Sequence, residues 1–405
     1  MREAVLIQGE VRAYQAPAPL AVTQLALTDF RCYASLRLSA ACGPVVLYGP
    51  NGAGKTNLLE ALSLLVPGRG LRRARQADVL REDAGTEACW AVAASVATQE
   101  GEVRIGTGRD PRAAARDEED VNGDDETSAP ERRLVRIDGE PRGPAALGEV
   151  MRAVWLTPEM DRLFIDGASA RRRFLDRAIQ GLDRGHAARL NAYQRTLRER
   201  SKLLRGMRAD PLWLDVLEDR MACDGVAIAA ARIHAAERIS AVASEGFGPF
   251  PGAMMKMEGA VEDSLAEVPA LEAETRLHDA LTRSRAEDAM TGGAAVGPHR
   301  SDLRVRHRAT NRPAERCSTG EQKALMIAMV LAIAVLQARE QGAAPILLLD
   351  EVAAHLDSAR RGALFERILD LGAQTWMTGT GPAAFAGLEG RAQAFRVGDG
   401  CAIAA

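Results

Sequence analysis

The chain has 405 residues, of which 47% are hydrophobic and 26% are charged, as in ordinary globular proteins. These proportions exclude collagen-like, disordered and disulfide-scaffold proteins, and the length corresponds to about two or three domains. The formal net charge is −3. Any nucleic-acid-binding surface therefore has to come from local clusters of basic side chains rather than from the overall charge.

The cysteines and the apolar segments give expectations about metal, compartment and membrane. The six cysteines are scattered and no two of them form a C-x-x-C pair, which disfavours a zinc site. Free thiols, together with an N-terminus that lacks the pattern of a signal peptide, predict a cytoplasmic protein. The longest apolar run, residues 324–337, is too short to span a membrane. We expect it to be a helix buried on all sides, and we expect no membrane partner.

The first 155 residues have the pattern of an α/β segment. Residues 1–24 look like an N-terminal extension. The charged stretch 108–131 has no periodicity and is expected to be an acidic surface loop. Apolar patterning predicts strands at 25–27, 45–48, 89–97, 102–106 and 134–138, and a helix at 55–65.

Residues 156–290 have a different character. Phe174, Ala178 and Leu182 recur near helical spacing, with arginines between them. We therefore predict a mostly α-helical lobe here, with helices over 211–244 and 271–289 and a break at 246–252.

Residues 291–405 return to mixed elements, with a buried helix at 320–339 and a strand at 346–349. The predicted fold is therefore α/β: an ABC-type P-loop ATPase lobe of mixed sheet and helices, formed by 25–155 and 291–405, with a mostly α-helical second lobe inserted into it. The two halves of one site can then lie far apart in the sequence.

A glycine-rich segment after the predicted strand at 45–48 matches the pattern G-x-x-x-x-G-K-[ST] and opens a helix. Backbone N–H groups of such a loop and the helix N-terminus surround a β-phosphate. Lys55 supplies positive charge to the β- and γ-oxygens, and the Thr56 hydroxyl can bind Mg²⁺. A glycine-rich turn with an incidental lysine is the alternative. The predicted ATP-binding residues are Gly49, Pro50, Asn51, Gly52, Ala53, Gly54, Lys55, Thr56 and Asn57.

The complementary segment is the apolar strand at 346–349 followed by Asp350 and Glu351. Asp350 is expected to hold Mg²⁺, directly or through water, and Glu351 to act as the general base that polarises the attacking water. An apolar strand that ends in acidic residues is weak evidence alone, but it becomes strong when paired with the phosphate loop. The long separation from Lys55 excludes a compact small GTPase and suits an ATPase core split by an insert.

The segment Ser318-Thr-Gly-Glu-Gln-Lys323 precedes the buried helix. A hydroxyl and free N–H groups at a helix N-terminus form an anion-binding arrangement. A helix cap, with Ser318 and Glu321 forming a capping box, is the simpler interpretation, and both can be true together. Because the segment lies shortly before the Asp350 strand, it has the order of an ABC signature. We therefore predict nucleotide contacts from Ser318, Gly320 and Gln322.

Two further segments follow the acidic strand end. His355 and Asp357 match the D-loop of ABC ATPases, where the aspartate lies at a dimer interface; a polar first turn of the next helix is the alternative. Many ABC proteins carry a switch histidine after the next strand, and here the residues are Thr378 and Thr380. We expect one of these threonines to position water, or hydrolysis to be slow.

Taken together, these motifs resemble the RecF family of SMC-like ABC ATPases. Three more segments support the resemblance: the opening Leu27-Thr-Asp-Phe-Arg31 with Tyr33, the run 156–176 with its Arg-Arg-Arg-Phe-Leu-Asp core, and Gly297-Pro-His-Arg-Ser-Asp-Leu303. The resemblance covers roughly residues 25–400. The chain departs from the family pattern at Cys317, where a larger apolar residue is usual. For the Q-loop glutamine of the family, Gln76 is the only candidate.

The resemblance implies an ATP-dependent recombination mediator. Two copies are expected to close head-to-tail on two ATP molecules, each held by the phosphate loop of one copy and the Ser318–Gly320 signature of the other. Hydrolysis by Glu351 is expected to be slow and DNA-stimulated. Partners implied are duplex or gapped DNA, a second copy of the chain, RecR, RecO and RecA, in gap repair, replication maintenance and SOS induction.

The sequence locates DNA contacts poorly. Arg171, Arg172 and Arg173 are candidates for phosphate contact, although a solvated helix face or internal pairing explains such a run equally well. The Arg72-Arg73 pair has the same two interpretations. Two other classes stay open on the core motifs: an ABC transporter nucleotide-binding subunit and a non-hydrolysing, nucleotide-gated DNA scaffold.

Overall fold

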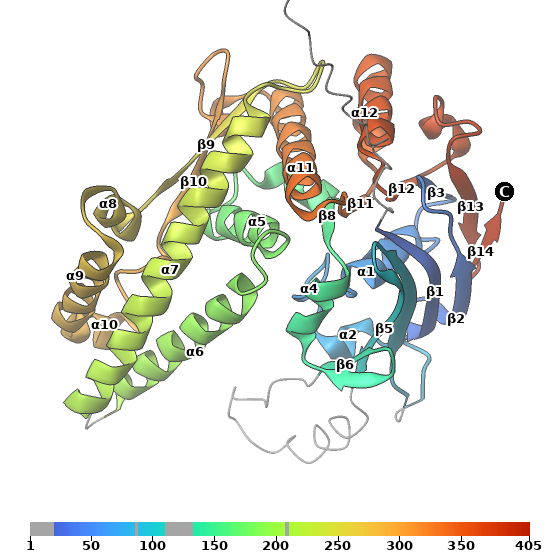
Figure 1. The fold of residues 1–405 in the computed structure, drawn as a ribbon. Coiled ribbons are helices and arrows are strands. Elements are labelled where there is room, and N and C mark those ends of the chain that lie inside the picture. The colour runs from blue at the N-terminus through green and yellow to red at the C-terminus, as the bar shows by residue number, and fades with distance from the viewer. Residues whose placement is uncertain (1–19, 86–87, 110–132, 207–209) are drawn as a thin grey trace, which may run out of the picture.

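The computed structural model describes residues 20–85, 88–109, 133–206 and 210–405. Figure 1 shows helices α5–α10 gathered on one side of the molecule and the large sheets on the other. Most of the predicted N-terminal extension and of the predicted acidic loop lie outside the described residues. The lobe boundaries at 24, 155 and 290 stay predictions.

The first sheet is antiparallel, with strand order β2-β1-β4-β5-β6-β7. Its strand β1 begins at Ala21, earlier than expected, because Ala21 and Val22 are fully buried and pair with β4 before a register shift between Val22 and Gln24. The strands are β1 (Ala21–Phe30), β2 (Tyr33–Ser39), β4 (Ala91–Thr98), β5 (Gly101–Arg109), β6 (Arg133–Ile137) and β7 (Glu140–Arg142).

The second sheet has strand order β14-β13-β3-β12-β11-β8, and all neighbours except β13 and β14 are parallel. Its central strands are short apolar runs buried on both faces, as parallel strands require. The strands are β3 (Val45–Tyr48), β8 (Ala153–Leu156), β11 (Ile346–Leu349), β12 (Thr375–Gly379), β13 (Gln393–Gly398) and β14 (Cys401–Ala404).

The two sheets share one hydrophobic cluster, which also receives helix α1 (Lys55–Ser63). The buried amide of Gln374 joins them: its Nε2 donates to the carbonyls of Val22 and Ala41, and its Oε1 accepts from the N–H of Val22. The short helices of this part are α2 (Gln76–Val79), η1 (Pro144–Ala146), α4 (Leu147–Val150), η2 (Pro158–Arg162), η4 (Val352–His355), α12 (Ser358–Leu371) and η5 (Pro382–Phe385).

The helical part is formed by α5 (Ala168–Gln180), α6 (His186–Arg205), α7 (Pro211–Ala243), α8 (Ala260–Glu267), α9 (Ala270–Arg283) and α10 (Arg285–Thr291). The single helix expected at 271–289 is two helices. They are separated at Ser284, whose hydroxyl donates to the carbonyl of Leu281 and to Asp288 Oδ2 and so competes with continuation of the helix.

Two strands in this region pair as an antiparallel ribbon, β9 (Ala253–Glu258) with β10 (Asp302–His307). Strand β9 was not predicted from the sequence. Its residues alternate in burial, but methionines lie at 254, 255 and 257, so the apolar pattern does not separate the two faces.

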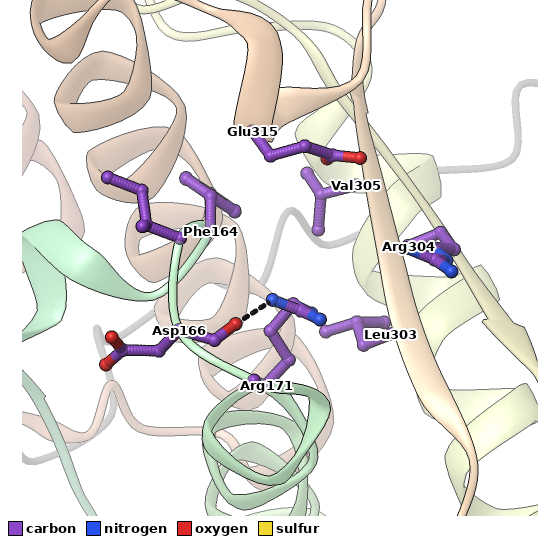
Figure 2. Close-up of a pocket in the computed structure, with 9 residues that line it drawn as sticks. Phe164, Asp166, Arg171, Leu303, Arg304, Val305 and Glu315 are labelled. Atoms are coloured by element: carbon purple, nitrogen blue, oxygen red, sulfur yellow. Dashed lines mark hydrogen bonds between the residues drawn. The ribbon is translucent and has the colours of Figure 1, made fainter.

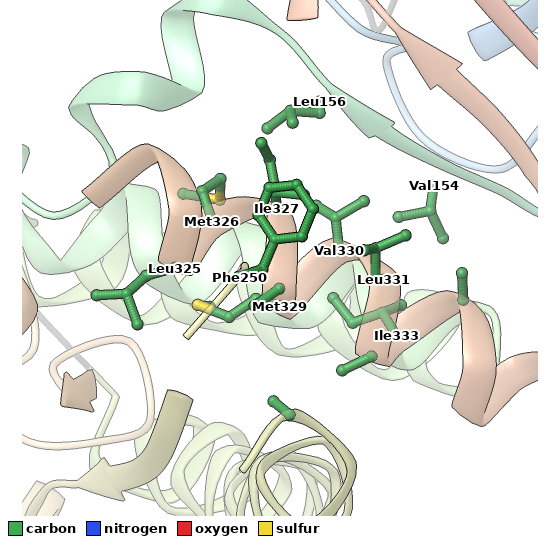
Figure 3. Packing of buried hydrophobic residues seen from close by; sticks show 14 of the residues in the cluster. Val154, Leu156, Phe250, Leu325, Met326, Ile327, Met329, Val330, Leu331 and Ile333 are labelled. Carbon is green, nitrogen blue, oxygen red and sulfur yellow. The ribbon is translucent and has the colours of Figure 1, made fainter. Parts of the chain in front are cut away.

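Helix α11 (Thr319–Gln341) follows the short helix η3 (Ala314–Arg316) and lies in the middle of the largest hydrophobic cluster. Figure 3 shows Met326, Ile327 and Val330 packed near Val154 and Leu156 of β8. Within the described residues α11 alone is long and apolar enough to cross a membrane, but 72% of its apolar window is buried inside the protein. Packing in the core therefore accounts for its hydrophobicity, as expected.

Candidate nucleotide-binding site

Three parallel strands bring the candidate site residues to one edge of the second sheet. Gly49 follows β3, Asp350 follows β11, and Thr378 lies near the end of β12. Carboxyl ends of parallel strands meet at the same edge, which is where α/β folds bind ligands. The N–H of Gly49 donates to the carbonyl of Gly379 at 3.3 Å, so the glycine-rich loop is joined directly to this edge.

The glycines of the loop are required by its geometry. Gly54 has φ +99° and caps the N-terminus of α1. A Cβ at Gly54 would lie 2.6 Å from Cys32 Sγ and 2.7 Å from Tyr33 Oη, so no other residue fits without displacing them. Tyr33 also donates a hydrogen bond from its hydroxyl to the Gly54 carbonyl at 3.1 Å. Strand β2 therefore supports the phosphate loop from behind.

Lys55 is the first residue of α1 and only 4% exposed. Its ammonium group donates to the carbonyls of Gly49 and Pro50, both at 2.8 Å. The charge is thus held inside the loop by groups that carry only partial negative charge. Phosphate oxygens are stronger acceptors for an ammonium group, so the arrangement favours an anionic ligand at this point.

Thr56 and Asp350 lie in direct contact at the same edge. The Thr56 hydroxyl lies 2.9 Å from Asp350 Oδ1 and 3.1 Å from Oδ2. Asp350 is 6% exposed, and its N–H donates to the carbonyl of Leu156 at the end of β8. A hydroxyl and a carboxylate at one point form the hard oxygen donor set that Mg²⁺ prefers.

Thr378 belongs to this group in a way that the sequence did not indicate. It is buried, and its hydroxyl donates to Asp350 Oδ1 at 2.7 Å. Thr378 Oγ1 in turn accepts a hydrogen bond from the N–H of Glu351 at 2.8 Å. Glu351 has a left-handed backbone with φ +53°, so this hydrogen bond helps to fix an uncommon conformation. Because both hydrogen-bonding directions of Thr378 are used, its role is to orient the two carboxylate residues. Thr380 is exposed.

A buried carboxylate anchors the segment that follows α1. Glu60, on α1, is 2% exposed and forms ion pairs with Arg31 at 2.7 Å and Arg72 at 3.0 Å. Arg72 also donates to Asn57 Oδ1 at 2.7 Å. The structure therefore agrees with internal pairing for Arg72. Arg73 forms no ion pair with the described residues.

The signature segment forms the start of α11, and Ser318, Thr319 and Gly320 are exposed. Ser318 Oγ accepts the N–H of Glu321 at 3.3 Å, and Glu321 Oε2 accepts the N–H of Ser318 at 2.8 Å. This reciprocal pair is a complete capping box. Hydrogen bonds from Ser318 hold the pKa of Glu321 below its ordinary value. The cap and an anion site at the same helix N-terminus are compatible, because Thr319 and Gly320 of the first turn are exposed.

Gln322 turns away from the exposed face. Its side chain is 5% exposed, and its Nε2 donates to the carbonyl of Cys317 at 3.0 Å. It therefore holds the signature loop, and a direct nucleotide contact from Gln322 has no support in this geometry. Asp357 caps α12 by accepting the N–H of Arg360 at 2.8 Å. This agrees with the alternative that Asp357 belongs to the polar first turn of the next helix. The backbone of His355 lies in η4, and its side chain lies outside the described residues.

The three consecutive arginines of α5 have different surroundings. Arg171 forms a bidentate ion pair with Asp302, with nitrogen–oxygen distances of 2.7 and 3.0 Å, and Arg172 donates to the Ser301 carbonyl. Figure 2 shows Arg171 beside Asp166 at the wall of a cavity of about 430 Å³. Arg173 is exposed. Internal pairing therefore explains Arg171, and a phosphate contact from it would require breaking that pair.

Two of the family-like segments meet in a buried network. Arg232 of α7 forms a bidentate pair with Asp176 of α5, both distances being 2.8 Å, and also donates to the Pro298 carbonyl. His186 Nε2 lies 3.0 Å from the same carboxylate. Burial alone raises the pKa of Asp176, but the hydrogen bonds from His186 and Arg232 hold it below its ordinary value. These segments therefore join the helical part together.

The parallel sheet edge, the phosphate loop, the Thr56–Asp350 contact and the inserted helical part define an ABC-type P-loop ATPase fold. Comparison with known proteins agrees. The family model described as "RecF/RecN/SMC N terminal domain" matches residues 21–386. The DNA replication and repair protein RecF of Mesorhizobium japonicum is 46% identical over 387 residues, which cover 95% of this chain and 98% of the relative. That of Rhizobium rhizogenes is also 46% identical, over 388 residues.

The chain therefore belongs to the RecF family, as the sequence predicted. Solved structures agree on the fold. The structure of "the recombination mediator protein RecF-ATPrS in RecFOR pathway" superposes with a TM-score of 0.80 at 23% identity, over 96% of this chain and all of that one. An Smc head bound to a winged-helix domain of ScpA superposes with a TM-score of 0.52 at 16% identity. These likenesses confirm the predicted ABC-type fold class with its helical insert.

Proposed function

We propose that this chain is an ATP-dependent, DNA-binding recombination mediator that hydrolyses ATP slowly and uses it to open and close a dimer. The contact between Thr56 and Asp350 carries the proposal, because it places a hydroxyl and a buried carboxylate beside the phosphate loop that holds Lys55. The family relatives described as DNA replication and repair proteins, and the solved relative described with ATP, support the same assignment.

Each residue of the edge has a role in this proposal. The loop N–H groups and Lys55 bind the β- and γ-phosphates. Thr56 and Asp350 hold Mg²⁺, which neutralises charge on the phosphate oxygens when bound. Glu351 accepts the proton of the attacking water. Thr378 holds Asp350 and Glu351 in position through its two hydrogen bonds.

The exposed signature supports a dimer of head-to-tail arrangement. Ser318 and Gly320 lie exposed at the N-terminus of α11. A triphosphate bound in the loop carries more negative charge than one helix N-terminus compensates, and a second N-terminus from another copy adds to it. ATP then joins the two copies, and hydrolysis separates them. We also propose that Asp357 lies at this interface, because it follows Glu351 in the chain at the place of the D-loop aspartate of ABC ATPases.

The proposed partners follow from the family. Duplex DNA, preferably near a single-strand gap, is the proposed substrate of the closed dimer, and RecR, RecO and RecA are the proposed partners that lead to RecA loading, replication maintenance and SOS induction. The proposed location is the cytoplasm. We also propose that the lobes divide at the boundaries given by the sequence, with residues 156–290 as the inserted lobe.

Size-exclusion chromatography with light scattering, with and without Mg²⁺ and ATP, tests the proposal. The wild-type chain is expected to change from monomer to dimer with ATP, and gapped duplex DNA is expected to stabilise the dimer. Lys55→Arg is expected to abolish the change, because the larger guanidinium does not fit the slot between the Gly49 and Pro50 carbonyls. Steady-state phosphate release with and without DNA measures the expected stimulation.

Glu351→Gln separates binding from hydrolysis. It is expected to keep ATP-dependent dimerisation, lose phosphate release, and accumulate the dimer on DNA. Normal phosphate release by this variant would show that Glu351 is not the base. A wild-type chain that stays monomeric with ATP and gapped DNA would contradict the clamp.

A further inference from the structure

The last residue of the signature segment, Lys323, has its side chain turned into the protein. Lys323 carries the single positive charge of this segment, and its side chain is only 13% exposed. Its ammonium group donates a hydrogen bond to Asp161 Oδ2 at 3.3 Å. Ser318 and Gly320, by contrast, are exposed. The segment therefore has an open outer face, while its lysine is held from inside by a carboxylate.

Asp161 belongs to the short helix η2, which follows the candidate Mg²⁺-binding edge of the same copy. The carbonyl of Leu156, the last residue of β8, accepts the N–H of Asp350 at 2.9 Å. Helix η2 begins shortly after this contact. Met160, which precedes Asp161, packs against both of the large hydrophobic clusters. The position of η2 is therefore fixed on two sides, and Asp161 connects the candidate metal edge to the start of α11.

The ion pair compensates an unfavourable position of the lysine charge. Side chains of an α-helix lean toward its N-terminus, which itself carries a partial positive charge. The ammonium group of Lys323 therefore lies close to a charge of its own sign, and its low exposure removes part of its hydration. The Asp161 carboxylate offsets both effects. Without this carboxylate, we expect the lysine to turn toward solvent and to shift the first turn of α11.

The other side-chain contacts of the signature segment are local. Ser318 and Glu321 cap each other, and Gln322 donates to the carbonyl that precedes Ser318. These contacts define the shape of the segment. The pair between Lys323 and Asp161 differs from them, because it reaches an element 162 residues away in the chain. Packing of the apolar residues of α11 places the helix as a whole, and this pair fixes the orientation of its first turn.

We propose that Asp161 is a positioning residue for the signature segment. Through Lys323 it holds the first turn of α11 in the orientation that a nucleotide bound to another copy meets. The assignment rests on the proposed function, in which two copies close on ATP, and it adds a residue that acts without touching the nucleotide. Because η2 follows the Leu156 carbonyl that binds Asp350, Asp161 also relates the signature of each copy to the Mg²⁺-binding edge of that copy. Loss of the Asp161 charge then weakens dimerisation and leaves nucleotide binding by the phosphate loop unchanged.

Analytical ultracentrifugation of the full chain with Mg²⁺ and a non-hydrolysable ATP analogue tests the assignment. Asp161→Asn is expected to raise the dimer dissociation constant about fivefold or more, which is the lower end of ordinary coupling between sites. Asp161→Glu keeps the charge and is expected to stay close to the wild type; an equally weak dimer in this variant would overturn the assignment. The matched control is Glu340→Gln, which removes an ion pair with Arg238 at the other end of α11. The control is expected to keep the wild-type dissociation constant.

A double-mutant cycle tests whether Asp161 acts through Lys323. Lys323→Met is expected to weaken the dimer as Asp161→Asn does. The two changes together are expected to do no more than Lys323→Met alone, because they remove the same ion pair. Additive effects would show that the two residues act independently and would overturn the assignment. The melting temperature is expected to change no more in Asp161→Asn than in Glu340→Gln, so a general loss of stability does not account for the weaker dimer.

Nucleotide binding by the monomer separates the ways in which the assignment can fail. At protein concentrations below the dimer dissociation constant, Asp161→Asn is expected to bind a fluorescent ATP analogue with wild-type affinity. If this affinity falls as much as dimerisation does, Asp161 acts on the phosphate loop of its own copy, and the assignment is overturned. If Lys323→Met abolishes dimerisation while Asp161→Asn leaves it unchanged, Lys323 contacts the nucleotide, and the assignment is again overturned. If the wild type does not dimerise with the analogue, the proposed function is overturned and the assignment falls with it.

Discussion

The hydroxyl of Thr56 lies 2.9 Å from Oδ1 of Asp350, although 294 residues separate the two in the chain. The contact exists because β3 and β11 are parallel strands of one sheet with only β12 between them, so the residues that follow them reach the same edge. The intervening chain, including the whole helical part, can then be long without affecting the edge. This relationship makes the proposed Mg²⁺-binding and hydrolytic steps testable by single substitutions.

Asp350→Asn is expected to weaken Mg²⁺-dependent ATP binding and to reduce turnover. The amide keeps a hydrogen-bond acceptor for Thr56 but loses the negative charge that a divalent cation requires. Losing a residue that supports a metal ligand from the outer shell typically lowers metal affinity about 10- to 100-fold. We expect Asp350→Asn to lower it by more. Isothermal titration with Mg²⁺ and ATP and phosphate release measure it. The control is Asp370→Asn on α12, an exposed residue paired with Arg367; equal behaviour of both variants would contradict the assignment.

Thr378→Val is expected to reduce turnover while leaving dimerisation by ATP in place. Valine has a similar shape but leaves the N–H of Glu351 and one hydrogen bond of Asp350 unsatisfied, at a cost of about 1–3 kcal/mol in stability. Displacement of Glu351 by about 1 Å is enough to lower turnover up to about a hundredfold. Phosphate release and thermal unfolding measure the two effects.

Thr378→Ser is the matched control, because it keeps the hydroxyl. It is expected to turn over ATP much faster than the valine variant. If Thr378→Val hydrolyses ATP at the wild-type rate, the hydroxyl does not position Glu351.

Local patterns in the sequence predicted the elements that position the candidate site. The strands at 45–48 and 346–349 are confirmed at the predicted bounds, because short apolar runs bounded by glycine or acidic residues have few alternatives. The helix after the phosphate loop is confirmed, although α1 ends at Ser63. The conformation of the phosphate loop depends on its own glycine, lysine and threonine residues, so it can be predicted from this short segment alone.

Contacts between distant segments were not predictable in the same way. Nothing around Thr378 indicates that its hydroxyl joins Asp350 to Glu351, because this depends on the register of β11 against β12. The run of arginines at 171–173 looks uniform in sequence, yet only the fold shows that Asp302, from β10, pairs with the first of them. Likewise, no feature of the sequence around Gln322 indicates whether its side chain points inward or outward.

Arg232→Met is expected to destabilise the helical part strongly. The change leaves the Asp176 carboxylate buried with only His186 as a side-chain partner, and losing one member of a buried ion pair costs about 3–5 kcal/mol. Urea unfolding followed by circular dichroism measures the loss. The control, Arg276→Met, removes two exposed ion pairs, with Glu267 and Glu272, and is expected to leave the free energy of unfolding nearly unchanged. Adding Asp176→Asn to Arg232→Met removes the unpaired charge and is expected to recover part of the loss; no recovery would contradict this explanation.

The stability of the protein is expected to fall as the pH is lowered from about 6.5, the ordinary pKa of histidine in an unfolded chain, because of His299. Its Nε2 donates to the carbonyl of Ala294 at 3.0 Å, which leaves Nδ1 as the acceptor for the Tyr193 hydroxyl at 2.8 Å, so the ring is neutral in the fold. Burial lowers the pKa of His299, and nearby arginines lower it further, while the hydrogen bond to Ala294 acts in the opposite direction.

The sign of the effect follows from proton binding. Between the folded pKa of His299 and about pH 6.5 the unfolded chain binds more protons at this position than the folded chain, so the stability contributed above pH 6.5 is lost as the pH falls. One such group changes the free energy of unfolding by at most about 1.4 kcal/mol per pH unit. Urea unfolding midpoints of the wild type and of His299→Gln, measured from pH 7.5 to pH 5.5, test this. The variant is expected to have a shallower pH dependence, while His234→Gln, at an exposed position, keeps the wild-type one; an unchanged slope in His299→Gln would place the titrating group elsewhere.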